Sequence, residues 1–120
     1  MKDDPLFKYP AYVKALELFD RTLEDTGNLL NDIRGREITK QVIRSVGSIS
    51  ANFEEGYGRG TSKEFLHSLR ISNGEARESK GWYWRSRRFF SEELVNKRMK
   101  EIEEVIALIS SMIRTLQNKK

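Results

Sequence analysis

The chain has 120 residues, with 22 Lys or Arg, 18 Asp or Glu, one His and no Cys, which gives a net charge of +4. Its length suits one domain, residues 1–120, that is large enough to bury its own core. The lack of Cys excludes a disulfide framework, a thiolate metal site and a cysteine nucleophile. The N-terminus lacks the apolar stretch of a signal peptide, and no run approaches the roughly 18 apolar residues of a membrane span. We therefore expect a cytoplasmic protein with no membrane contact.

The positive charge is concentrated in one segment of the chain. Residues 59–90 carry 8 basic and 3 acidic side chains, whereas residues 1–58 carry 8 and 10, and residues 91–120 carry 6 and 5. A polyanionic partner is therefore to be sought at residues 59–90.

Apolar residues recur at spacings of three and four along most of the chain, and no strand-like alternation is sustained. In the first segment Pro10 suits an opening helical turn, and Gly27 weakens the end of the pattern. The second segment follows a turn signal at Arg34-Gly35 and stops at Gly56. The spacing predicts four helices, over residues of about 10–29, 36–55, 62–90 and 92–117.

The first and fourth predicted helices carry stripes of large apolar residues that we expect to face the core. In the first helix the stripe consists of Tyr12, Leu16, Phe19, Leu23 and Leu30. In the fourth it consists of Val95, Met99, Ile102, Ile106, Ile109, Ile113 and Leu116. This last face is widened by Val105, Leu108 and Met112, either because another subunit covers it or because the helix is well covered in the core.

The stripe of the third predicted helix is large at both ends and small in the middle. It consists of Phe65, Leu69, Ser72, Ala76, Ser79, Tyr83, Ser86 and Phe90. The small residues would let a neighbouring helix come close. Gly74 and Gly81 each cost roughly 1 kcal/mol against alanine inside a helix, which either a close helix approach or a local bend would offset.

Long helices joined by short connections pack antiparallel to their sequence neighbours. The predicted fold is therefore all-α, an antiparallel up-down-up-down four-helix bundle. The predicted helices of about 20 to 28 residues would make rods roughly 30 to 42 Å long.

The stretch from Asn52 to Phe65 contains three glycines around an arginine. A dinucleotide or P-loop site needs glycines after a buried strand and a different spacing, so nucleotide binding of those types is not expected. The alternative is a helix corner, in which Gly56 takes the left-handed conformation that ends a helix while Gly58 and Gly60 reverse the chain. Thr61 and Glu64 then form a capping box at the start of the third helix.

The open backbone N–H groups at that helix start, with Arg59 beside them, are suited to one phosphate or carboxylate. The other interpretation of the same residues is a turn with a purely structural role. The residue pattern leaves both open.

At these residues the sequence resembles the 23S rRNA-intervening-sequence proteins, a bacterial family of four-helix bundles. The resemblance extends from about Phe7 to Leu116 and rests on Asn52, Glu55-Gly56-x-Gly58-Arg59, Thr61-x-x-Glu64-Phe65, Leu69-Arg70-Ile71 and Gly74. It implies a small cytoplasmic bundle that assembles as a ring, typically a homopentamer, with no established catalytic activity. The family name suggests RNA. The chain is also distantly similar to the accessory protein of diversity-generating retroelements, which implies nucleic-acid and reverse-transcriptase partners.

On a helical wheel the third predicted helix separates its charges by sign. Its basic side chains follow a line that includes a tryptophan, whereas Glu64, Glu75 and Glu78 lie on another flank. Such a line suits a phosphate backbone with a stacked base. The candidate residues for binding a nucleic acid or another anion are Arg59, Lys63, Arg70, Arg77, Trp84 and Arg88.

Two other interpretations of this face stay open. It is either a solvated surface, in which Arg70 or Arg77 can pair with a neighbouring helix, or a contact between subunits of a ring. In the ring, Trp82, Trp84 and Phe89 would anchor the interface.

Catalysis is not expected. Glu64-x-x-His67 matches half of a di-iron motif, but such a site needs two pairs of this kind and further carboxylates, and this chain has one His. The adjacent Glu54 and Glu55 diverge on a helix and do not form an acid–base pair. We therefore expect no enzyme activity, no cofactor, no metal and no small-molecule substrate.

The function predicted from the sequence is that of an oligomeric helical bundle that binds RNA or another nucleic acid through the third helix. The alternative is a structural assembly or protein-interaction module in which the same face is a subunit interface.

Overall fold

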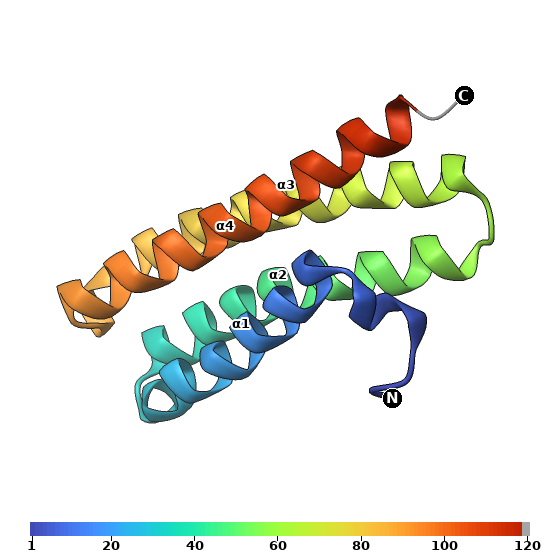
Figure 1. Ribbon diagram of the computed structural model, residues 1–120. Coiled ribbons are helices and arrows are strands. Elements are labelled where there is room, and N and C mark those ends of the chain that lie inside the picture. The colour runs from blue at the N-terminus through green and yellow to red at the C-terminus, as the bar shows by residue number, and fades with distance from the viewer. Residues whose placement is uncertain (119–120) are drawn as a thin grey trace.

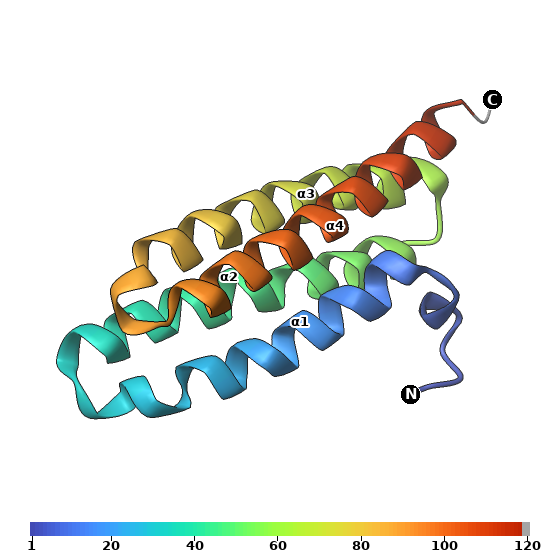
Figure 2. The ribbon, with the colours of Figure 1, turned by 60° about the vertical axis from the view of Figure 1, so that its left-hand side comes forward.

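The computed structural model describes residues 1–118, which form four α-helices and three short 3-10 helices (Figure 1). The α-helices are α1 (Pro10–Thr26), α2 (Ile33–Gly58), α3 (Ser62–Arg85) and α4 (Glu92–Gln117). The 3-10 helices cover Pro5–Lys8, Gly27–Asn31 and Arg87–Phe89. The α1–α2 and α3–α4 connections lie at one end of the molecule and the α2–α3 connection at the other (Figure 2). For these residues the prediction of an all-α chain with four helices is confirmed.

The connection between α1 and α2 differs from the one that the sequence predicts. α1 stops before Gly27, and α2 begins directly after Asp32. The Asp32 carboxylate accepts hydrogen bonds from the backbone N–H groups of Arg34 at 2.7 Å and Gly35 at 3.4 Å. The predicted turn at Arg34-Gly35 is therefore wrong, because these residues form the first turn of α2. The hydrogen bond from the Arg34 side chain lowers the pKa of Asp32 to about 2, so that the cap stays ionised.

The corner between α2 and α3 lies later in the chain than the sequence predicts. α2 continues through Gly56 to Gly58, so the prediction of a left-handed helix end at Gly56 is wrong. Gly60 is the residue within 1–118 that has a positive φ, of 86°, a conformation that costs glycine little. The hydroxyl of Thr61 then accepts a hydrogen bond from the N–H of Glu64 at 3.1 Å and caps α3.

α3 is shorter than predicted, because it ends at Arg85 instead of continuing to residue 90. The hydroxyl of Ser86 donates to the carbonyl of Trp82 at 2.7 Å, and the chain then turns through a 3-10 helix, Arg87–Phe89. Arg88 therefore does not belong to α3. α4, by contrast, begins and ends at the predicted residues.

Small residues bring α2 and α3 into close contact. In the middle of α3, the hydroxyl of Ser72 donates to the carbonyl of Ile49 at 2.7 Å, and Ser79 lies 2.8 Å from Ser45, all within the buried core. This is the close approach that the stripe of α3 predicts. The hydroxyls have partners, so their burial carries no penalty of an unpaired polar group.

Gly56 brings the same two helices together near the corner. A Cβ atom at this position would lie 2.3 Å from the Cβ of Ser68 on α3. The glycine is therefore required because the Ser68 side chain leaves no room for a Cβ atom at this position.

The buried faces of α1 and α4 are rotated relative to the predicted stripes. The residues of α1 that are buried are Ala11, Tyr12, Ala15, Leu18, Thr22 and Thr26, whereas Leu23 is 46% exposed. Those of α4 are Val95, Arg98, Ile102, Val105 and Ile109. Met99, Ile106 and Ile113 of the predicted stripe are half-buried beside them.

A buried polar network joins three helices at the end of the bundle where α3 meets α4. Arg98 of α4 donates two hydrogen bonds to Asp25 of α1, at 2.7 and 3.0 Å. The hydroxyl of Tyr83 on α3 also donates to Asp25, at 2.7 Å, and lies 2.9 Å from the hydroxyl of Thr22. The hydrogen bond to Asp25 raises the pKa of Arg98, and burial raises that of Tyr83, so both keep their protons.

This network was missed by sequence reasoning, although it holds the end of α3 in place. Arg98 lies three residues after Val95 and four before Ile102, so it is on the core-facing side of α4. A prediction based on apolar residues alone passes over Arg98. It therefore places the buried stripe on Met99, one residue later.

The close contact at Gly56 predicts an effect opposite to helix propensity. We expect Gly56→Ala to lower the free energy of unfolding by roughly 1–3 kcal/mol, because the added methyl overpacks against Ser68. Gly58→Ala is the control, since no atom lies within 4 Å of its Cβ position, and it should be neutral or slightly stabilising. Urea unfolding measures both, and equal effects of the two substitutions would contradict the close contact.

The buried network predicts a large loss of stability when one partner is removed. Asp25→Ala should cost roughly 3 kcal/mol, because it removes two of the hydrogen bonds of the Arg98 side chain, which is 10% exposed, and leaves Glu101, at 3.0 Å, as its remaining carboxylate partner. The double substitution Asp25→Leu with Arg98→Met should recover part of this loss. As a control, Lys14→Ala removes an exposed ion pair with Glu104 and should cost less than about 1 kcal/mol. A similar cost for Asp25→Ala and Lys14→Ala in urea unfolding would show that the network contributes little.

Candidate nucleic-acid interface

Four of the six predicted binding residues lie on one line along α3, which we call the basic face. They are spaced seven residues apart, or about 10 Å at the rise of an α-helix. All four side chains are exposed, and Trp84 retains 55% of its accessible surface. The basic face consists of Lys63, Arg70, Arg77 and Trp84.

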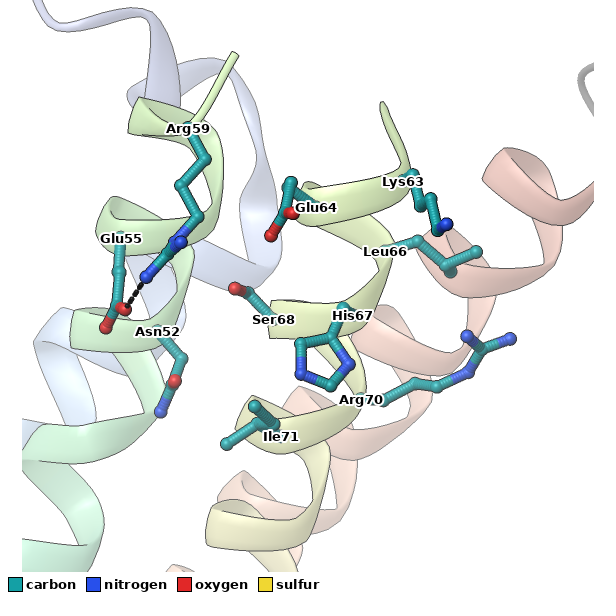
Figure 3. Close-up of a pocket in the computed structure, with 10 residues that line it drawn as sticks. All are labelled: Asn52, Glu55, Arg59, Lys63, Glu64, Leu66, His67, Ser68, Arg70 and Ile71. Atoms are coloured by element: carbon teal, nitrogen blue, oxygen red, sulfur yellow. Dashed lines mark hydrogen bonds and ion pairs between the residues drawn. The ribbon is translucent and has the colours of Figure 1, made fainter. Parts of the chain in front are cut away.

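Figure 3 shows how the start of this face is oriented. Lys63 and Arg70 extend on the side of α3 turned away from α2, whereas Glu64 and Ile71 point toward α2. His67 is exposed and points outward between these two sides. The helix thus turns its cationic residues away from α2 from its first turn onward.

The acidic flank of α3 is engaged by α2. Arg44 of α2 forms ion pairs with both Glu78 and Glu75, the latter at 3.8 Å. The carboxylates are therefore neutralised against the neighbouring helix and do not reach across to the basic face. The separation of the two signs that the sequence predicts is present in the structure.

The cations of the basic face keep their charge available to solvent. Within residues 1–118, no carboxylate lies within ion-pair distance of Lys63, Arg70 or Arg77. The interpretation in which Arg70 or Arg77 pairs with a neighbouring helix of its own chain is therefore wrong.

Arg59 does not share this environment. It follows α2, and its guanidinium donates to Glu55 at 2.9 Å (Figure 3). The hydrogen bond to Glu55 raises the pKa of Arg59, with smaller electrostatic contributions from Glu55 and Glu64. The grouping of Arg59 with the basic face is not supported, because its charge is already balanced by a carboxylate one helical turn earlier.

Arg88 also lies away from the line, because α3 ends before it. It belongs to a hollow of about 670 Å³ at the end of the bundle, next to Phe89 and to Ile33 of α2. Ile33 is 68% exposed there, and the guanidinium of Arg34 lies 5.9 Å from the centre of the Phe89 ring. This end of the molecule is a mixed apolar and basic surface.

A pocket of about 540 Å³ lies between the end of α2 and the start of α3 (Figure 3). Its lining includes Arg59, Lys63 and Arg70, but also the carboxylates of Glu55 and Glu64. These acids weaken the attraction for an anion at the helix start. The described part of the chain contains no group of three or more side chains suited to hold a metal ion.

Another cavity, of about 460 Å³, lies on the basic face itself, where α3 passes α4. It is lined by Arg77, Lys80, Gly81 and Trp84 of α3 and by Met99 of α4. Lys80 and Gly81 were not among the predicted site residues. Their positions could have identified them, because Lys80 and Gly81 lie four and three residues before Trp84 and so share its side of the helix.

Gly74 and Gly81, the two glycines of α3, do not serve a close approach between helices within residues 1–118. No atom lies within 4 Å of the Cβ position of Gly74, and at Gly81 the nearest atom is the Nη1 of Arg85, at 2.9 Å, at the tip of a flexible side chain. Packing against a neighbouring helix therefore does not explain either residue.

None of the helices formed by residues 1–118 is both long enough and apolar enough to span a bilayer.

Comparisons with known proteins agree with this architecture. The chain matches a crystal structure from Bacteroides thetaiotaomicron VPI-5482, described as a protein of unknown function from the S23 ribosomal protein family. The match has a TM-score of 0.80 and 26% sequence identity, and it covers 87% of this chain and 95% of that one. A search of curated proteins found no match. The family model for the 23S rRNA-intervening sequence protein matches residues 8–111, and the chain therefore belongs to this family.

Proposed function

We propose that the protein is a non-enzymatic helical bundle that binds RNA, or another nucleic acid, through the basic face of α3. One observation carries this proposal: the cations at 63, 70 and 77 are exposed and lack a carboxylate partner within residues 1–118, while Glu75 and Glu78 of the same helix are paired with Arg44 of α2. When such a line of unpaired cations binds a phosphate backbone, counterions are released from the nucleic acid, and this release favours binding. Binding of this kind requires no catalytic residue.

The family description supports RNA as the partner in a limited way. It refers to an intervening sequence of 23S rRNA, and the similar Bacteroides protein is described as one of unknown function. Location in the cytoplasm, where such RNA occurs, is part of the proposal.

The proposal includes assembly of up-down-up-down bundles into a ring, with a homopentamer as the expected form. Large apolar side chains that stay accessible on the outside of the chain support an assembly, because a subunit contact would remove them from water. Leu23 and Leu30 are 46% and 51% exposed, and Ile106 and Ile113 of α4 are half-buried.

A second candidate function is that of an assembly module in which the basic face itself is the subunit contact. The observation that favours it is the exposure of Trp84, a residue type enriched where interfaces bury most. In that case a neighbouring subunit would supply the missing carboxylates.

Charge reversal on the basic face separates these two functions. We expect Arg70→Glu with Arg77→Glu to lower affinity for a mixed RNA pool by on the order of tenfold or more at 0.1 M salt, because two phosphate contacts are lost. The slope of log affinity against log salt should fall by roughly 0.7 per residue. Fluorescence anisotropy across a salt series measures both quantities, and light scattering reports the oligomeric state of the same samples.

The matched control is Lys40→Glu with Lys97→Glu, which makes the same change in net charge at exposed positions on α2 and α4. This control should bind RNA almost as well as the unmodified protein. Loss of the oligomer in the Arg70→Glu, Arg77→Glu variant would instead favour the subunit contact. Unchanged RNA binding and unchanged assembly would contradict both functions of the basic face.

A further inference from the structure

The cavity beside Trp84 has the size and lining of a site for a planar ring attached to an anion. It is a shallow hollow of about 460 Å³ that opens widely to solvent. Trp84 and Met99 supply apolar surface, and Arg77 and Lys80 supply positive charge. A nucleotide unit has this combination of an aromatic base and a phosphate.

The ring of Trp84 is held in position although it is exposed. The guanidinium of Arg87 lies 4.4 Å from the ring centre, and its Nη1 donates to the carbonyl of Trp84 at 3.0 Å. The preceding residue, Tyr83, is fixed in the core by its hydrogen bond to Asp25. An aromatic ring that is already oriented loses little freedom when another ring stacks on it.

The charges around the cavity favour a phosphate. Arg77 lacks a carboxylate partner within residues 1–118, and the Nζ of Lys80 lies 3.4 Å from Glu103 of α4. Glu103 is 56% exposed, so its pair with Lys80 is weakened by solvent and can be exchanged for a phosphate contact.

Stacking on Trp84 requires a base whose flat face is accessible. In a duplex both faces of each internal base are covered by its neighbours, and a protein reaches a face only after the base has been extruded. In a single strand the bases are free to stack on aromatic side chains. A surface made of cations alone would not distinguish the two forms.

We propose that the cavity formed by Arg77, Lys80, Gly81, Trp84 and Met99 binds one unpaired base of a single-stranded nucleic acid. This inference rests on the proposed nucleic-acid function and specifies that the bound nucleic acid is single-stranded. The base stacks on Trp84, the adjoining phosphate lies between Arg77 and Lys80, and the strand continues along α3 toward Arg70 and Lys63.

Gly81 fits this role as the floor of the cavity. Because it has no side chain, the ligand approaches the helix backbone between Arg77 and Trp84. The nearest atom to its Cβ position belongs to the Arg85 guanidinium, which can move aside. The Arg85 guanidinium, which lies 4.8 Å from the centre of the Trp82 ring, has to move for a ligand to reach the backbone at Gly81.

The test compares single-stranded RNA with a duplex of the same sequence and length, using fluorescein-labelled oligonucleotides. Trp84→Ala should weaken single-strand binding by about 5- to 150-fold, the usual range for loss of one stacked base, and should change duplex binding little. Trp84→Phe should restore part of the single-strand affinity. Arg77→Glu should weaken both forms, because it removes a phosphate contact.

A second variant separates a ligand role from a structural one. Gly81→Ala should raise the urea midpoint of unfolding, because alanine favours the helix, and should at the same time weaken single-strand binding by narrowing the cavity. A variant that is more stable yet binds less tightly is not explained by damage to the fold.

The outcomes distinguish the two proposals. If neither form of RNA binds to the unmodified protein at low salt, the proposed function itself fails. If RNA binds but Trp84→Ala lowers single-strand and duplex affinity equally, or lowers neither, the nucleic-acid function stands and the stacking site is overturned. If Trp84→Ala dissociates the oligomer, the cavity belongs to a subunit contact.

Discussion

The close approach of α2 and α3 determines which surfaces of the protein are free. Gly56 against Ser68, and Ser45 against Ser79, bring the two helices nearer than larger residues would allow. With one side of α3 packed against α2, Glu75 and Glu78 fall within reach of Arg44. The basic residues are left on the side turned away from α2. Separation of charge on this surface is thus a consequence of packing in the core.

The same contact also fixes the position of α3 along its axis. The buried serines bond at defined places, with Ser72 reaching the carbonyl of Ile49 and Ser79 reaching Ser45. A shift of α3 by one turn would break both contacts between the helices, and Ser79 would keep only its hydrogen bond to the carbonyl of Glu75 in the same helix. At the other end, Tyr83 and Arg98 meet on Asp25 and hold the helix terminus. A uniformly apolar interface would not specify the alignment so closely.

The sequence predicted much of this fold because the helical spacing of apolar residues is strong, above all in α4. It did less well where polar residues replace apolar ones in the core. Arg98, Thr22, Ser72 and Ser79 are buried because each finds a specific partner, and such partners depend on residues far apart in the chain. The turn at Arg34-Gly35 was wrongly predicted because an aspartate cap two residues earlier had already started the helix. Of the candidate site, the line from Lys63 to Trp84 follows from helical geometry alone, whereas the ion pair of Arg59 and the early end of α3 before Arg88 do not.

Arg70 and Arg77 have no ion-pair partner among residues 1–118, and this has a consequence for how the protein can change over evolution. Residues that take no part in core packing or in ion pairs with their own chain can be replaced at little cost to folding. Members of a lineage can therefore exchange the side chains of this surface, and with them the preferred ligand, while the buried serine and arginine contacts keep the scaffold constant. Selectivity and stability are encoded on opposite sides of one helix.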